Sequence, residues 1–187
     1  MTGEVAVVRP PEVRSPRAPS HVGRTKGAAS MAGDTVAREP GQGTAFWMLG
    51  GLYEVKVSSA ESDGALTLME MTMPTGMGPP PHTHPGGETV YVLEGRIRYH
   101  INGETFEGRP GSTFHVPAGT LENFEPVEQS RLLVLYTPGG IEKFFAEAGE
   151  PAQSRELPPA PTGPPDIERL VAIGQKHGMD IRPPAAV

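Results

Sequence analysis

Turn signals recur at short, regular intervals between residues 40 and 138, and this spacing constrains the fold more than any other feature of the sequence. Pairs such as Gly50-Gly51, Asn102-Gly103 and Pro110-Gly111 separate short apolar runs. Short runs between turn residues are typical of an all-β sandwich or barrel. A helical bundle is excluded, because 24 of the 187 residues are Gly and 22 are Pro.

The apolar runs predict a series of short strands. We expect them at 45–49, 52–58, 65–73, 81–84, 88–94, 96–102, 104–107, 112–116, 121–125 and 131–137. Asn102-Gly103 predicts a type I′ hairpin, because both central positions of that turn need a positive φ. In the strand before it, the alternation places Ile97, Tyr99 and Ile101 toward the core.

The period changes to a helical one after Gly140. Ile141, Phe144, Phe145 and Ala148 form one apolar stripe and predict a helix that ends at Gly149. A Pro-rich connector follows, and a second helix is expected from Asp166 to about Lys176. We expect both helices to pack on the outside of the β domain.

Three regions are therefore predicted: a disordered, basic, Pro-rich tail (1–38), a β-barrel (39–140) and C-terminal helices with their connector (141–187). The net charge of −6 is uneven, because residues 1–30 carry five basic and two acidic side chains while the rest of the chain is strongly acidic. An acidic body repels polyphosphate, so we expect no nucleic acid as a partner.

The chain has no cysteine, which excludes disulfides, thiolate metal sites and a cysteine nucleophile. Its apolar runs are shorter than a membrane span needs, and its N-terminus does not resemble a signal peptide. We expect a soluble, cytoplasmic protein without a membrane partner.

His82, His84 and Glu88 are the candidate metal-binding residues. Two histidines that are two residues apart on a strand point to the same side, and Glu88 opens the next strand after the turn Pro85-Gly86-Gly87. Two imidazoles and a carboxylate are suitable ligands for a divalent first-row metal ion. Burying three such groups without a partner costs several kcal/mol, and a bound cation removes that cost.

These residues resemble the first motif of the cupin family, G-x5-H-x-H-x3-E-x6-G. Gly76, His82, His84, Glu88 and Gly95 match it without a gap.

The second cupin motif, G-x5-P-x-G-x2-H-x3-N, is matched by Gly111, Pro117 and Gly119. It then departs, because Glu122 stands where the family has its fourth ligand, a histidine, and Pro126 stands where it has Asn.

The resemblance covers residues 44–137, and the flanking segments look like those of single-domain quercetin dioxygenase-like cupins. It implies a cupin-type double-stranded β-helix, or jelly-roll barrel, that holds one divalent first-row metal ion (Fe, Mn or Ni). It also implies a homodimer, which exposed sheet edges would favour.

The resemblance leaves three roles for Glu122: a fourth metal ligand beside His82, His84 and Glu88, a catalytic acid or base, or a structural side chain. A second carboxylate ligand would favour harder ions such as Mn and Fe. The candidate substrate-binding residues are Phe46, Trp47, Met71 and His115.

The first functional hypothesis is a metal-dependent oxidoreductase that acts on a small aromatic or polyketide-like molecule, by resemblance a quercetinase-type dioxygenase. The second is a non-redox isomerase, cyclase or lyase of secondary metabolism that uses Glu122 as acid or base. The third is a non-catalytic cupin that binds a small molecule. Oxygen consumption separates the first from the second, and metal removal tests the third.

Overall fold

The computed structural model describes residues 35–161 and 163–183. Nearly all of the predicted N-terminal tail lies outside the described residues. The elements are β1 (Ala45–Met48), β2 (Gly51–Val57), β3 (Thr67–Met73), β4 (His82–Thr83), β5 (Gly87–Glu94), β6 (Ile97–Ile101), β7 (Glu104–Gly108), β8 (Thr113–Val116), β9 (Glu122–Pro126), β10 (Ser130–Thr137), α1 (Glu142–Ala148), β11 (Glu150–Pro151), α2 (Ile167–Lys176) and β12 (Asp180–Ile181).

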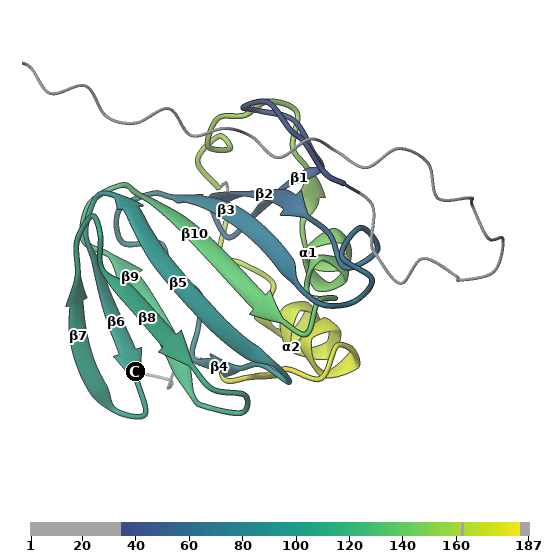
Figure 1. Ribbon diagram of the computed structural model, residues 1–187. Coiled ribbons are helices and arrows are strands. Elements are labelled where there is room, and N and C mark those ends of the chain that lie inside the picture. The colour runs from purple at the N-terminus through teal and green to yellow at the C-terminus, as the bar shows by residue number, and fades with distance from the viewer. Residues whose placement is uncertain (1–34, 162, 184–187) are drawn as a thin grey trace, which may run out of the picture. The chain divides into compact units, whose positions relative to one another are not determined.

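The strands form two antiparallel sheets (Figure 1). One has the order β11-β1-β2-β3-β10-β5-β8, and the other has the order β12-β4-β9-β6-β7. Alternate residues of the strands point inward, so that side chains such as Met69, Val90, Tyr99 and Leu132 build a buried core between the sheets. The predicted all-β jelly-roll barrel is confirmed.

All ten predicted strands are present, with boundaries that differ by one or two residues. The Asn102-Gly103 turn has positive φ at both residues, 50° and 84°, and closes the expected hairpin through the pair Ile101 and Glu104. Sequence patterns did not predict β11 and β12, because two residues are too few to show an alternation.

One motif glycine is explained by its surroundings. Gly95 has a φ of 77°, and a Cβ atom at this position would lie 2.2 Å from the carbonyl oxygen of Gln129. Only glycine fits both the left-handed backbone and this close approach.

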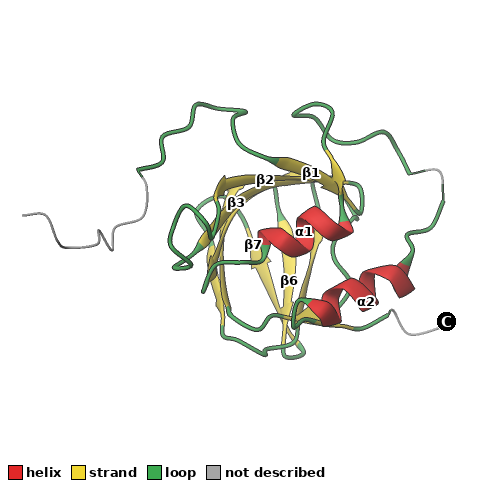
Figure 2. Cartoon of the chain, turned by 90° about the vertical axis from the view of Figure 1, so that its right-hand side faces the viewer, coloured by secondary structure: helices red, strands yellow, loops and turns green. Residues whose placement is uncertain are grey.

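The two helices lie across one end of the barrel (Figure 2). The apolar stripe of α1 is buried as predicted, and Phe145 stacks on Tyr53 with ring centroids 4.9 Å apart. The helices are therefore not only packed on the outside of the β domain, because Phe144, Phe145 and Leu170 reach the cavity inside the barrel mouth.

Glu142 fixes the first turn of α1 to the larger sheet. Its carboxylate accepts hydrogen bonds from the backbone and hydroxyl of Ser59 and from the hydroxyl of Thr67. Burial alone would raise the pKa of Glu142, but these hydrogen bonds lower it.

None of the helices in residues 35–161 and 163–183 has the length and apolar character that crossing a membrane requires.

Candidate metal centre

The first motif spans both sheets. His82 lies on β4 and His84 directly follows that strand, whereas Glu88 lies on β5 of the larger sheet. Glu122 begins β9 and is the register partner of His82. The backbone N–H of Gly119, a residue of the second motif, donates to the carbonyl oxygen of His84. The two motifs therefore meet at the barrel mouth.

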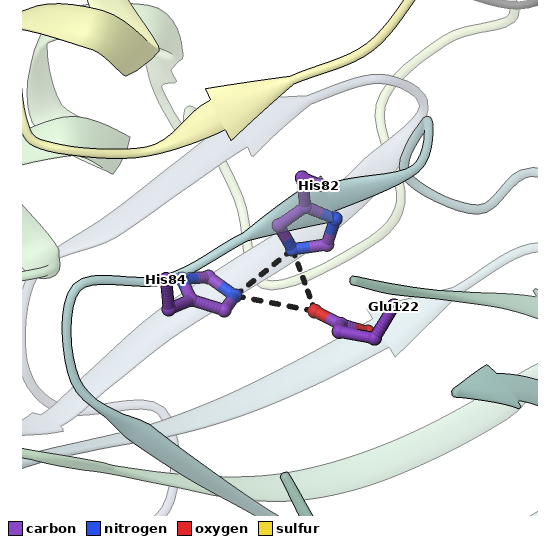
Figure 3. A group of neighbouring side chains, drawn as sticks. All are labelled: His82, His84 and Glu122. Carbon is purple, nitrogen blue, oxygen red and sulfur yellow. Dashed lines mark hydrogen bonds and ion pairs between the residues drawn. The ribbon is translucent and has the colours of Figure 1, made fainter. Parts of the chain in front are cut away.

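Three side chains converge on one point (Figure 3). The Nε2 atoms of His82 and His84 are 2.9 Å apart, and Oε1 of Glu122 lies 2.8 Å from the first and 3.3 Å from the second. All three residues are buried, and Glu122 is only 1% exposed. Their imidazole and carboxylate groups are therefore shielded from bulk water.

The hydrogen bonding of His82 indicates which nitrogen faces this point as an acceptor. Its Nδ1 lies 3.0 Å from the carbonyl oxygen of Pro80, which only an N–H can satisfy. In the neutral imidazole, Nε2 then carries a lone pair that points at Oε1 of Glu122. Two acceptors at 2.8 Å repel each other unless a proton or a metal cation lies with them.

The pKa values of His84 and Glu122 are both shifted toward the charged forms of these groups. Burial alone would lower the pKa of His84, but its hydrogen bonds with Glu122 and Glu88 and their negative charges raise the pKa to about 9. Conversely, burial would raise the pKa of Glu122, but the attraction and hydrogen bonds of His82 and His84 lower it. The site thus favours a positive charge between the imidazoles and the carboxylate.

The same geometry fits a metal ion. Three ligand atoms on one face of an octahedron, each about 2.1 Å from the ion, lie about 3.0 Å from one another. The three observed separations, 2.8, 2.9 and 3.3 Å, are close to this value. Within the described residues, the buried carboxylate of Glu122 has no hydrogen-bond donor besides the two imidazoles. Two imidazoles and one carboxylate form the donor set of non-heme Fe(II) sites, and such a set suits other first-row ions as well.

Glu88 is held differently. The buried hydroxyl of Tyr99 donates to its Oε1 at 2.8 Å, and its Oε2 lies 3.0 Å from Nε2 of His84. The pKa values of Tyr99 and Tyr136 are well above the ordinary value, first because both phenols are buried and next because of the charge of Glu88. Glu88 therefore contacts His84 from β5, whereas Glu122 contacts both imidazoles.

A narrow apolar cavity lies over the three residues. Its free volume is about 40 Å³, and His82, His84, Glu88 and Glu122 supply its polar wall. The apolar wall comes from the barrel, the helices and β12, through Met48, Leu49, Tyr53, Met71, Pro79, Pro80, Phe124, Tyr136, Phe144, Phe145, Leu170, Met179 and Ile181. A second cavity of about 210 Å³ lies beside it, and both cavities are lined by His84 and Tyr136.

Of the four predicted substrate-binding residues, only Met71 lines the cavity over the metal centre. Phe46 packs in the core near Gly149, and the indole N–H of Trp47 donates to the carbonyl oxygen of Glu156. His115 is exposed and bonds Thr89. Phe46 and Trp47 do not line the cavity, but the next two residues in the sequence, Met48 and Leu49, do.

The sequence did not reveal the cavity residues of the C-terminal segment. Leu170, Met179 and Ile181 follow a Pro-rich connector and lie far from both motifs in the sequence. The apolar face of α2 predicted that this helix packs against the rest of the protein, but not which part of the barrel it contacts.

Comparisons with known proteins agree with this architecture. Residues 69–138 match the family described as "Cupin domain". Quercetin 2,3-dioxygenase of Bacillus subtilis is 26% identical over 125 residues, which are 66% of this chain and 37% of the relative. The chain thus spans little more than a third of the length of this curated relative.

A solved structure shows the same fold. An RmlC-like cupin from Shewanella frigidimarina matches with a TM-score of 0.52 and 14% identity, over 59% of this chain and 96% of that one. KdgF from a Halomonas species matches with a TM-score of 0.49 and 19% identity, over 55% of this chain and 91% of that one.

Proposed function

We propose that this chain, a member of the cupin superfamily, is a metal-dependent oxidoreductase that acts on a small aromatic or polyketide-like molecule in a dioxygenase-like reaction. The observation that carries the proposal is the buried group of His82, His84 and Glu122 below an apolar cavity. The similarity to a quercetin dioxygenase supports the class of reaction.

In this proposal His82, His84 and Glu122 hold one divalent ion, namely Fe, Mn or Ni. Of the three roles considered for Glu122, that of ligand has the best support, because a carboxylate with a lowered pKa is a weak base. A bound ion would supply Lewis acidity toward an enol or phenol. Glu88, which Tyr99 orients, is then the carboxylate available to take the proton of the substrate.

The apolar wall favours a substrate with few charges, because a charged group placed against it would lose its hydration without gaining a partner. A volume of about 40 Å³ accommodates an ion and a water molecule or two but not an aromatic ring system. Binding such a substrate therefore requires side chains of the helices or β12 to move outward.

Metal analysis of protein purified without chelators is the first test. We expect about one first-row metal ion per chain and its loss in His84→Ala. His115→Ala is the matched control, because this histidine is exposed and lies outside the centre. Absence of metal from the unmodified protein, with none taken up on addition, contradicts the proposal.

Oxygen uptake with a flavonol such as quercetin tests the reaction. We expect uptake that matches substrate loss and that disappears in His84→Ala. Turnover that is unchanged without oxygen contradicts a dioxygenase and supports the isomerase, cyclase or lyase. Ligand binding that survives complete metal removal, without turnover, supports a non-catalytic binding protein.

A homodimer is also proposed, and the outer face of the larger sheet supports it. Tyr91 on β5 is 44% exposed and lies opposite Leu133 on β10, so that two apolar side chains are adjacent on the outer face. Strand β8 beside them is a sheet edge. Light scattering coupled to size exclusion should give twice the mass of the chain.

A further inference from the structure

The strand that carries His82 has little support of its own. Strand β4 is two residues long, and on one side it pairs with β9 only through His82 and Glu122. On its other side it pairs with β12, through Thr83 with Asp180 and His82 with Ile181. The yellow strand beside His82 in Figure 3 is this C-terminal neighbour.

Hydrogen bonds extend this contact past the end of β12. The backbone N–H of Arg182 donates to the carbonyl oxygen of Pro81 at 2.8 Å, directly before His82. The side chain of Arg182 is exposed, and among residues 35–161 and 163–183 its one ion-pair partner is Asp180. The backbone of Arg182 therefore contacts the metal-binding strand, whereas its side chain does not.

Helix α2 holds β12 in place. The N–H of Met179 donates to the carbonyl oxygen of Gly174 at 2.9 Å, and Met179 and Ile181 are both buried. A Cβ atom at Gly174 would lie 2.6 Å from Cδ1 of Ile181, so the helix and the strand are in tight contact. The C-terminal segment thus forms a packed support rather than a loose end.

We propose that β12 is a positioning element of the metal centre, which keeps Nε2 of His82 within ligand distance of His84 and Glu122. This inference rests on the proposed metal site. Groups that orient a ligand without touching the ion typically change metal affinity 10- to 100-fold when they are removed. Strand β4, with a single residue pair to β9, depends on such a group more than a long strand would.

The sharpest test compares Arg182→Pro with Arg182→Ala in the full chain. Both remove the guanidinium, but only proline removes the N–H that bonds Pro81. Proline is compatible with this position, because residue 182 follows an extended strand and already precedes Pro183. The affinity for Mn²⁺, measured by titration calorimetry, and the electron paramagnetic resonance spectrum of bound Mn²⁺ are the readouts.

We expect Arg182→Ala to bind Mn²⁺ within about twofold of the unmodified chain and Arg182→Pro to bind about tenfold more weakly, with a broadened spectrum. Equal affinities and spectra for the two variants overturn the positioning role of β12 and leave the metal site intact. Failure of the unmodified chain to bind Mn²⁺ overturns the metal site itself, and the inference with it.

A second variant acts from the helix side and does not depend on proline. In Gly174→Ala the new Cβ displaces Ile181, and the higher helix propensity of alanine offsets part of this packing cost. We expect several-fold weaker Mn²⁺ binding, and rescue by Ile181→Val, which removes the clashing Cδ1 methyl. Unchanged Mn²⁺ affinity in Gly174→Ala contradicts the proposal.

Discussion

Glu88 and His82 face the same centre from strands of very different length. Glu88 lies on β5, an eight-residue strand that is hydrogen-bonded to β10 on one side and β8 on the other. His82 lies on the two-residue β4, which depends on one residue pair with β9 and on the C-terminal β12. Glu88 is therefore held by a long, doubly paired strand, while His82 lies on backbone that has few pairing residues.

The two carboxylates of the centre differ in the same way. Glu88 has a dedicated donor in Tyr99, whereas in the described part of the chain the two imidazoles are the only donors near Glu122. A buried carboxylate that accepts a hydrogen bond from another side chain, as Glu88 does from Tyr99, needs no ion as a partner. One that is not satisfied gains its partner only from a cation or a protonated imidazole.

Leu132→Ala should produce the largest change and leave the centre unaffected. Leu132 is fully buried on β10, between Met71 and Val92, and does not line the metal cavity. We expect a loss of about 3 kcal/mol in the free energy of unfolding, from the removed methyl groups and the cavity left behind. Urea denaturation measures it. A parallel loss of Mn²⁺ affinity would show that the core packing around Leu132 also affects the metal centre.

Glu122→Gln compared with Glu88→Gln tests the two carboxylates. Glutamine keeps the size of each side chain but removes the charge. We expect Glu122→Gln to weaken Mn²⁺ binding about 100-fold, which is about 2.7 kcal/mol, and Glu88→Gln to weaken it less than tenfold. Titration calorimetry measures both affinities. The reverse order would identify Glu88 as the essential ligand, and circular dichroism controls for folding.

The smallest expected effect lies far from the centre. Arg38, first, and then Ser58 lower the pKa of Glu61 from 4.5 to about 2 through hydrogen bonds. Because the pKa is lower in the folded state, the stabilisation is present above pH 4.5 and is lost as the pH falls toward 2.

Thermal melts between pH 5 and pH 2.5 should show this loss, reduced in Glu61→Gln. The difference should be small, since Glu61 is partly exposed and its ion pair is screened by salt. An identical pH dependence in the two proteins would exclude a contribution from this pair.

Much of the barrel was predictable because its signals are local. Strand alternation and the Asn102-Gly103 turn are set by neighbouring residues, and the structure bears them out. His82, His84 and Glu88 were identified by their spacing. That Glu122 contacts both histidines while Glu88 contacts His84 was not predictable, because it depends on the register of β4 with β9 and on the hydrogen bond from Tyr99 to Glu88.

Sequence patterns also did not predict which residues line the cavity. Trp47 was expected there as a large aromatic residue, but its strand directs it toward Glu156. Ile181 was not expected, because nothing local in a two-residue strand indicates which distant strand it will join. Contacts between residues far apart in the sequence decide both cases.

The pairing of β4 with β12 joins residues that are almost a hundred positions apart, as the contact between Thr83 and Asp180 shows. Early strands can associate while a chain is still being synthesised. Among the described strands, however, the neighbour that completes the His82 strand is synthesised last. The pairing of β4 on this side can therefore form only after the rest of the described barrel has been made.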